Sequence, residues 1–502
     1  MDASTETDVL IAGAGPVGLF LANECARRSL RFVIVEQHSG QSEHSKALAI
    51  FPRTFEIFDM AGIVAPFLER ANRATSVGVI VHGRDLAHLP FAPADTPYPF
   101  VAMVPQDVTE RLLAETLARR GGAIRYDTTL VSAVERDGAV DAIVEQRGQQ
   151  AGLRASFLVG CDGAHSAVRH LLGLPFAGAQ YQLTFMLADV ETHTALPANE
   201  LQLCPHERGP LAIFPIGETR RRIVATVDAA AGDAPTLEAV NALLRERGPR
   251  GIEAESLHWS SYFGVHHRQV AQLRAGRIFL AGDAAHIHSP FGGQGMNTGL
   301  GDAWNLAWKL DLAIRGSARP ELLASYSVER RPVIRSVIRT TDRITKVMGA
   351  EGRVAQAIRD LAIPMVARLP LFQRTFVRRL SQLGISYHGS PIVQGAGKRY
   401  LDASLRRGGV GRRFLLLLGG NVPAAADQEA RRLADDWKDI LELRPGGRQG
   451  ILLIRPDGYT AYDSWTATPR TLRVVRELLD RQAISGPSAA VRASGEETRA
   501  AA

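Results

Sequence analysis

The chain has 502 residues, 45% of them hydrophobic, and a formal net charge of +7, which predicts two or three domains with an ample core. The basic residues are spread along the chain rather than gathered into an arm, which argues against nucleic-acid binding. No apolar run reaches the ~20 residues that span a bilayer, the N-terminus has no signal-peptide pattern, and the three cysteines are scattered, so we expect a cytoplasmic protein with no membrane span, disulfide framework or metal site.

The first predicted elements, within residues 8–36, are a buried strand, a glycine-rich turn, a helix and a second strand ending in an acid. Gly13, Gly15 and Gly18 have the G-x-G-x-x-G spacing. Gly13 permits the tight turn, Gly15 lets a pyrophosphate approach the backbone, and Gly18 lets the helix pack against the strand. The helix N-terminus attracts phosphates, and Glu36 can accept ribose hydroxyls. The pattern predicts a site for an ADP-containing dinucleotide, and the alternative is that the glycines serve packing alone.

The middle of the chain alternates between this domain and a second lobe. Residues 71–100 predict a strand pair that leaves the first domain and returns. Residues 155–160 predict another buried strand, which leads into a D-G-x-x-S-x-x-R turn over 162–169. Residues 180–262 are strand-like, apart from a helix at 237–247, and predict a mostly antiparallel sheet.

A third strand-end motif follows the buried strand predicted over residues 277–281. It contains Asp283 and a glycine-rich stretch, residues 292–297, before a strong helix over 298–314. A carboxylate at a strand end beside a glycine-rich helix entry suits a second site for anions and hydroxyl groups. The alternatives are helix capping by Asp283 and a plain tight turn, and the three motifs together favour ligand binding.

The C-terminal third is predicted to be helical and then α/β. Residues 321–348 predict a long helix bent at Pro332. From residue 401 a fresh pattern begins, with strands at 414–418 and 451–455 and helices at 425–437 and 472–482. All three cysteines precede residue 390, so this unit cannot perform dithiol chemistry, and we expect a structural or dimerisation element.

The three motifs, in this order, resemble those of the group A FAD-dependent aromatic hydroxylases. That family has the p-hydroxybenzoate hydroxylase fold, and the branch is that of phenol and aromatic polyketide hydroxylases. The resemblance spans about residues 8–335, and beyond about residue 390 the chain more weakly resembles the thioredoxin-like domain of that branch. The matching segments are Gly13–Gly18 with Glu36, Cys161–Arg169, and Gly282–Asn297.

The resemblance implies an α/β protein, α+β in the substrate lobe, whose Rossmann-like FAD domain carries the βαβ dinucleotide motif. An inserted, mostly antiparallel sheet forms the substrate domain, and a thioredoxin-like domain follows. The implied limits are 1–75, 101–178 and 268–390 for the FAD domain, 76–100 and 179–267 for the substrate domain, 391–485 for the thioredoxin-like domain, and 486–502 for a disordered tail.

FAD is the implied cofactor, and NADPH or NADH the co-substrate. Glu36 would bind the adenosine ribose, Gln106 the flavin side, and the backbone of Val131 the adenine. Lys46 stands where the family usually has Arg, which keeps the charge but loses the bidentate fork. The cofactor-binding residues implied by the resemblance are Gly13, Gly15, Pro16, Val17, Gly18, Glu36, Gln37, Lys46, Ala47, Gln106, Val131, Asp162, Arg169, Asp283, Pro290, Gly293, Gly295, Met296 and Asn297.

Several implied roles concern the reacting end of the cofactor. Asp283 would bind the ribityl or pyrophosphate region, and Asp162 and Arg169 would serve both FAD and the passing NAD(P)H. The backbone N–H groups of residues 295–297 would face the isoalloxazine O2, where a helix N-terminus stabilises negative charge. The carbonyl of Pro290 would lie beside flavin and substrate, the one catalytic position that the resemblance implies.

The implied reaction is hydroxylation of a phenolic or polycyclic polyketide substrate in antibiotic biosynthesis. NAD(P)H reduces the flavin, O2 forms a C4a-hydroperoxide, and an electron-rich ring takes the distal oxygen. The alternatives are Baeyer–Villiger oxidation or epoxidation on the same scaffold, an NAD-dependent dehydrogenase without oxygen chemistry, and a non-catalytic flavin-binding protein. We expect a monomer or a homodimer with no nucleic-acid, membrane or metal partner.

The substrate lobe gives a weaker signal. Residues 185–187 and 211–214 are apolar, and the basic run 220–222 would suit a bulky, partly anionic aromatic. The alternative is that these arginines form a solvated turn. No catalytic base can be named, and a structural or surface role is favoured for each candidate, namely His206, His258, Tyr262 and His266.

Overall fold

The computed structural model of the chain describes residues 5–41, 45, 47–92, 94–193, 196–228, 230, 232–289, 292–349, 352–400, 402, 405–409 and 411–484. Lys46, Pro290 and the predicted tail 486–502 lie outside the described residues. Their predicted roles therefore stay predictions.

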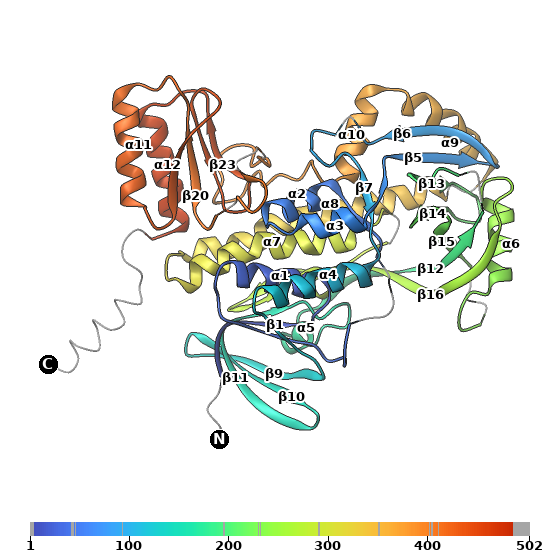
Figure 1. Cartoon of the computed structure of the whole chain (residues 1–502), viewed down its shortest axis with the longest axis horizontal. Coiled ribbons are helices and arrows are strands. Elements are labelled where there is room, and N and C mark those ends of the chain that lie inside the picture. Colours follow the sequence, from blue (N-terminus) through green and yellow to red (C-terminus); the bar gives the residue numbers. More distant parts are fainter. Residues whose placement is uncertain are drawn as a thin grey trace.

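The N-terminal pattern forms the centre of an eight-stranded sheet (Figure 1). Its order is β17-β18-β11-β1-β2-β8, with β10 beside β11 and β9 beside β10. The pairs β18–β11, β11–β1, β1–β2 and β2–β8 are parallel, so the carboxyl ends of these strands share one edge of the sheet. The strands are β1 (Thr5–Ala12), β2 (Phe32–Val35), β8 (Ile124–Arg125), β9 (Thr128–Arg136), β10 (Ala139–Gln146), β11 (Gln149–Gly160), β17 (Arg274–Ala275) and β18 (Ile278–Leu280).

Helices pack on this sheet and share its apolar core. Helix α1 contacts both α4 and α7, and α7 contacts α8. Proline occupies the first turn of α1, α2 and α8, where its missing N–H removes no hydrogen bond. The elements are α1 (Pro16–Arg27), α2 (Pro52–Met60), α3 (Val64–Arg70), α4 (Gln106–Arg119), α5 (Ala167–Leu171), a 3₁₀ turn (Gly282–Ala284), α7 (Gly295–Ile314), α8 (Pro320–Met348), and a small sheet of β3 (Ala49–Ile50), β4 (Asn72–Ala74) and β7 (Val101–Met103).

The second lobe is built on another eight-stranded sheet, β19-β16-β12-β15-β14-β13-β5-β6, antiparallel except for the pair β13–β5. Helix α6 covers one face, and α9 and α10 pack on β6. The predicted domain limits at 178 and 267 fall inside β12 and β16, so these strands run between the predicted domains. The elements are β5 (Ser76–Val81), β6 (Arg84–Pro90), β12 (Phe176–Thr192), β13 (Glu200–Cys204), β14 (Leu211–Pro215), β15 (Arg220–Val227), α6 (Leu237–Arg247), β16 (Ala254–Val270), β19 (His286–Ile287), α9 (Arg353–Ala367) and α10 (Pro370–Leu380).

The C-terminal unit lies at the opposite end of the molecule from the second lobe (Figure 1). Its elements follow in the order β-α-β-β-β-α, and its sheet β21-β20-β22-β23 has only β20 and β21 parallel. Within the described residues 441–454 no helix separates β21 from β22, so the thioredoxin-like assignment stays a prediction. Its core includes Trp308, Leu312 and Leu322 of α7 and α8, so the unit shares a core with the first domain. The elements are β20 (Phe414–Leu418), α11 (Ala424–Asp436), β21 (Leu441–Pro445), β22 (Ile451–Ile454), β23 (Thr460–Ser464) and α12 (Pro469–Gln482).

Candidate cofactor and substrate site

The three motif-bearing turns lie side by side at one edge of the first sheet. Ala12 pairs with Gly160, and Gly160 pairs with Leu280, so β1, β11 and β18 end level with one another. The turns are also joined by backbone hydrogen bonds, since Cys161 N donates to Ala12 O at 2.7 Å and Ala281 N donates to Gly160 O at 3.0 Å. The parallel register therefore gathers three sequence-distant motifs into one site.

The glycines of the first turn divide into two kinds. A Cβ on Gly13, whose φ is +98°, would lie 2.5 Å from Cys161 O, and a Cβ on Gly18 would lie 1.9 Å from Gly13 O. These two glycines are required by packing. Gly15 differs, because a Cβ there would have no neighbour within 4 Å and its φ of −70° suits any residue. Gly15 thus borders open space at the N-terminus of α1, as a phosphate-binding turn requires.

Glu36 closes the other side of this turn. Its Oε2 accepts a hydrogen bond from Ala14 N at 2.8 Å, and its Oε1 lies 2.6 Å from the Nδ1 of His38. The backbone N–H of Thr128 donates to Glu36 O at 2.8 Å, which brings the start of β9, the strand that carries the exposed Val131, beside Glu36. Gln37 is exposed on the same segment. Glu36 is therefore held over the turn and can accept further hydroxyl donors.

Gln106 and Ala47 are joined directly. Gln106 Oε1 accepts from Ala47 N, and Gln106 N donates to Ala47 O, both at 3.0 Å. Arg222 of the second lobe also donates to Ala47 O, at 3.3 Å. The carbonyl of Ala47 therefore links the two lobes. The sequence did not predict this contact of Arg222.

Asp162 and Arg169 differ in whether their polar side-chain atoms are already bonded within the protein. Asp162 Oδ2 accepts from Val168 N at 3.1 Å, while its buried Oδ1 has no hydrogen-bond partner among the described residues. Arg169 is buried, and it donates to the carbonyls of Ala284 at 3.0 Å and Ala164 at 2.8 Å. Burial lowers the pKa of Arg169. Asp162 therefore offers an unoccupied hydrogen-bond acceptor. Arg169 joins the second motif to the third, and the predicted contacts of both residues with FAD and NAD(P)H stay predictions.

The N-terminus of α7 is fixed by the side chain of Asn297. Its Oδ1 accepts from Phe51 N at 2.9 Å and Thr54 Oγ1 at 2.8 Å, and its Nδ2 donates to the carbonyls of Ala49 and Gly293. The sequence predicted only a role for the backbone of this residue. No side chain caps the helix at Gln294, so the first N–H groups of α7, from Gly295, Met296 and Asn297, are available to a bound anion.

The turn that follows β18 packs against both α1 and α7. A Cβ on Gly299 would lie 2.6 Å from Val17 Cγ2 and 2.9 Å from Gly282 Cα. Val17 therefore has a packing role in the structure, next to Pro16 in the buried first turn of α1. Asp283 is exposed on the 3₁₀ turn, and its predicted contact with FAD stays a prediction.

An aromatic face of the second sheet points toward the flavin end of α7. Phe185, Leu187, Ala212 and Val224 form its buried part, and Phe185 stacks on Phe263 with ring centroids 5.7 Å apart. The neighbouring side chains Leu203 and Phe214 also pack against β3 and β7, which adjoin Asn297. Met186, predicted with Phe185 and Leu187, lies on the opposite face beneath α6, because alternate residues of a strand point to opposite faces.

The basic run 220–222 is neither a solvated turn nor a set of free cations. Arg222 is buried and pairs with Asp189 through two contacts of 2.6 and 2.9 Å, and Arg220 reaches the same carboxylate at 3.3 Å. Arg221 is buried too and donates to Gly217 O at 2.7 Å. Two of the three arginines therefore share one carboxylate, and Arg221 donates to backbone carbonyls.

Three of the four weaker candidates have described side chains, and each of the three has a surface or core contact of its own. His258 lies 3.7 Å from Glu191 and is 42% exposed, and Tyr262 packs with the core beneath α6. Burial lowers the pKa of His206, which accepts a hydrogen bond from Arg208 N. The side chain of His266 lies outside the described residues. Within the described ranges no group of three metal-ligating side chains occurs, and no helix is long and apolar enough to cross a membrane.

These features fit an FAD. The open space at Gly15 suits a pyrophosphate, the held carboxylate of Glu36 suits a ribose, and the buried Asp162 Oδ1 lacks only a donor. The uncapped start of α7 suits the negative charge of a reduced flavin. The open space, the carboxylates and the helix N-terminus are thus of the kinds that a pyrophosphate, a ribose and a reduced flavin require.

Comparison with known proteins gives the same assignment. The sequence model of a family described as "FAD binding domain" matches residues 6–341. The chain is 33% identical to 6-methylpretetramide 4-monooxygenase of Streptomyces rimosus, over 90% of each chain. It is 32% identical to rifampicin monooxygenase of Streptomyces venezuelae, over 91% of this chain and 95% of the relative. Among solved structures, OxyS anhydrotetracycline hydroxylase from Streptomyces rimosus matches with a TM-score of 0.77 and 31% identity, over 95% of this chain and 99% of that one.

Proposed function

Since this chain belongs to the FAD-binding-domain family of flavin-dependent aromatic monooxygenases, we propose that its substrate is a polycyclic aromatic polyketide, which it hydroxylates with NAD(P)H and O2. The family membership sets aside the dehydrogenase and the non-catalytic alternatives. The observation that carries the substrate class is the aromatic face of the second sheet, with Phe185 stacked on Phe263. Stacking of this kind suits a flat, fused-ring ligand.

The charge of the substrate lobe favours a neutral or phenolic ring system. The Arg222 guanidinium is paired with Asp189 through Nε and Nη2, and its Nη1 donates to Ala47 O, so a substrate carboxylate would have to displace a buried ion pair. The relatives' names, which refer to a pretetramide and to rifampicin, are consistent with large polyketides. The sequence suggested a partly anionic aromatic substrate. We propose instead that the polycyclic substrate carries no negative charge.

The chain's own residues would bind and orient the cofactor. Glu36 would accept hydrogen bonds from the ribose hydroxyls, Gly15 would leave room for the pyrophosphate, and Asp162 would accept a hydrogen bond from a hydroxyl group. The first N–H groups of α7 would stabilise negative charge on the flavin ring. When bound, FAD supplies hydride acceptance from NAD(P)H and activation of O2. The aromatic face would exclude water and hold the substrate ring in place.

The test is anaerobic reduction of the bound flavin by NADPH and NADH, with and without a panel of polycyclic aromatics. We expect one class of ring system to accelerate reduction at least about tenfold, and ¹⁸O2 turnover to add one labelled hydroxyl to an intact ring. Reduction that is fast without substrate and indifferent to every aromatic would contradict the proposal. A labelled oxygen inserted into a carbon–carbon bond would favour the Baeyer–Villiger alternative.

A pair of tryptophan variants tests the location of the substrate. Trp259 borders the aromatic face, and Trp465 is 73% exposed on the C-terminal unit. Trp259→Ala should weaken binding of the accelerating compound about tenfold, because an aromatic contact is lost. Trp465→Ala is the matched control and should leave that affinity unchanged.

A further inference from the structure

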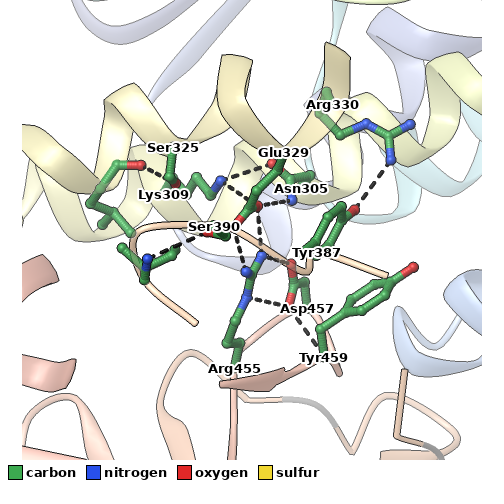
Figure 2. A network of polar contacts seen from close by, with 12 residues as sticks. Asn305, Lys309, Ser325, Glu329, Arg330, Tyr387, Ser390, Arg455, Asp457 and Tyr459 are labelled. Carbon is green, nitrogen blue, oxygen red and sulfur yellow. Dashed lines mark hydrogen bonds and ion pairs between the residues drawn. The ribbon is translucent and has the colours of Figure 1, made fainter. Parts of the chain in front are cut away.

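Helix α7 carries a stripe of polar residues on the side that faces α8 and the C-terminal unit. Thr298, Asp302, Asn305 and Lys309 recur at intervals of three and four residues and are all fully buried, which places them on one face of the helix. Figure 2 shows the part of this stripe that meets Glu329 of α8 and residues of the C-terminal unit. An interface that is otherwise apolar thus contains a row of buried polar and charged side chains.

Glu329 is the centre of the part nearest the C-terminal unit (Figure 2). It lies 2.8 Å from Lys309 Nζ, 2.7 Å from Ser390 Oγ, and 2.5 and 2.9 Å from the guanidinium of Arg455. Arg455 also binds Asp457. Burial alone would raise the pKa of Glu329, but Arg455 and Lys309 hold it well below its usual value. This cluster fixes the turn between β22 and β23 to α7 and α8.

Arg330 is the centre of the part nearest the cofactor site. Its Nε donates to Asp302 Oδ1 at 2.6 Å, its Nη2 to Thr298 O at 3.0 Å, and its Nη1 to Tyr387 Oη at 3.2 Å. A Cβ on Gly301 would lie only 3.1 Å from Nη2, so the guanidinium lies flat against α7. Arg330 therefore joins the start of α7 to the segment that leads into the C-terminal unit.

Asp302 carries this connection into the third motif. Its Oδ2 accepts from the backbone N–H of Gly282 at 3.1 Å and lies 2.7 Å from His286 Nε2. Gly282 opens the 3₁₀ turn that holds Asp283, and Thr298 lies in the first turn of α7. Both elements that Arg330 reaches, directly or through Asp302, therefore border the flavin site.

We propose that Arg330 is a positioning residue for the flavin. Tyr387, in the segment that leads into the C-terminal unit, holds the Arg330 guanidinium in place. Loss of the Tyr387 hydroxyl leaves a buried guanidinium N–H without a partner, and buried charges tolerate incomplete partner sets poorly. The guanidinium then shifts on Asp302 and Thr298, and the cofactor site shifts with them. Docking of the C-terminal unit thereby controls FAD affinity. The inference depends on FAD binding and not on the proposed substrate.

The chain supplies a matched pair of variants at this interface. Tyr387 and Tyr459 are both buried, with ring centroids 4.4 Å apart, and only the Tyr387 hydroxyl is bonded to Arg330 in Figure 2. Tyr387→Phe and Tyr459→Phe therefore remove the same atom from neighbouring sites. The FAD dissociation constant of each apoprotein is measured by quenching of flavin fluorescence, and the thermal midpoint of each apoprotein is measured separately.

We expect Tyr387→Phe to raise the FAD dissociation constant about tenfold, which corresponds to about 1.4 kcal/mol, and to alter the visible spectrum of the bound flavin. Tyr459→Phe should stay within about twofold of the parent chain. A Tyr387→Phe protein that melts earlier but binds FAD with unchanged affinity and spectrum would overturn the proposal, because its hydroxyl would then serve folding alone.

A second variant covers the case in which Tyr387→Phe does not fold. Gln382 Nε2 donates to Thr298 Oγ1 at 3.1 Å, so Gln382→Met removes a side-chain bond that the same connecting segment makes to the first turn of α7. Because this bond reaches α7 directly, whereas that of Tyr387 reaches it through Arg330 of α8, Gln382→Met should likewise weaken FAD binding, and an unchanged dissociation constant would refute the inference. A substrate panel without effect would count against the proposed function alone, since the FAD measurements do not involve substrate.

Discussion

The open space at Gly15 makes the glycine-rich turn testable one residue at a time. Gly15→Ala places a methyl group where no protein atom lies within 4 Å and where the φ of −70° is ordinary for alanine. We expect the free energy of unfolding of the apoprotein to change by less than about 1 kcal/mol. The same methyl group occupies the space that a pyrophosphate needs, so the FAD dissociation constant should rise at least about tenfold.

Gly18→Ala should behave in the opposite way. Its methyl group would lie 1.9 Å from Gly13 O, so the strand and the helix must separate, which costs the apoprotein at least about 2 kcal/mol. Gly420→Ala is the matched control, because Gly420 also has no neighbour within 4 Å but lies in the C-terminal unit. Urea denaturation of the apoproteins and fluorescence titration with FAD separate the two effects. Normal FAD affinity in Gly15→Ala, or a loss of stability equal to that of Gly18→Ala, would refute this reasoning.

Two further predictions concern the start of α7 and the loop before it. Asn297→Ala leaves the backbone groups of Ala49 and Phe51 without partners, so it should lower the free energy of unfolding by about 3 kcal/mol in urea; a loss below about 1 kcal/mol would contradict the assigned contacts. Burial lowers the pKa of His288 to about 4 in the folded protein. Between about pH 4 and pH 6.5 the unfolded chain therefore binds more protons than the folded chain, and the free energy of unfolding falls as the pH drops. Over this range the parent apoprotein should lose about 3 kcal/mol more than His288→Gln, and parallel pH profiles would show that burial does not shift this group.

The meeting of the three motifs could be predicted from the sequence because it follows from one rule. Buried apolar runs that end in turn residues form parallel strands, and parallel strands place their carboxyl ends together. The observed register, with Ala12 beside Gly160 and Gly160 beside Leu280, is the direct result. The division between Gly15 as the open position and Gly18 as the packing position also agrees with the sequence analysis, but the room at each position required the structure. Whether Gly15 or Gly18 has room for a methyl group depends on the packing of Cys161 and Gly13, which lie on different turns.

The pairing of Arg222 with Asp189 illustrates what the sequence could not give. The two residues are brought together by the antiparallel register of β12 and β15, and a one-residue slip would place them on opposite faces. Without that register, a run of three arginines suits an anion site, a solvated turn or an internal ion pair equally well. Whether Arg222 is free or paired with Asp189 decides whether the substrate lobe favours a charged or an uncharged ring.

The polar stripe of α7 left a signal in the sequence, since four polar residues recur at helical spacing in a helix whose other positions are mostly apolar. Its meaning required the partners, because Arg330 and Tyr387 come from other segments. A buried ion-pair network is weak evidence for stability, since apolar side chains of similar volume often serve as well. We infer that this network instead fixes one relative position of the elements it joins. Here one of those elements is the first turn of α7. Under the proposal above, the position of the C-terminal unit on α7 therefore also sets the geometry of the flavin site.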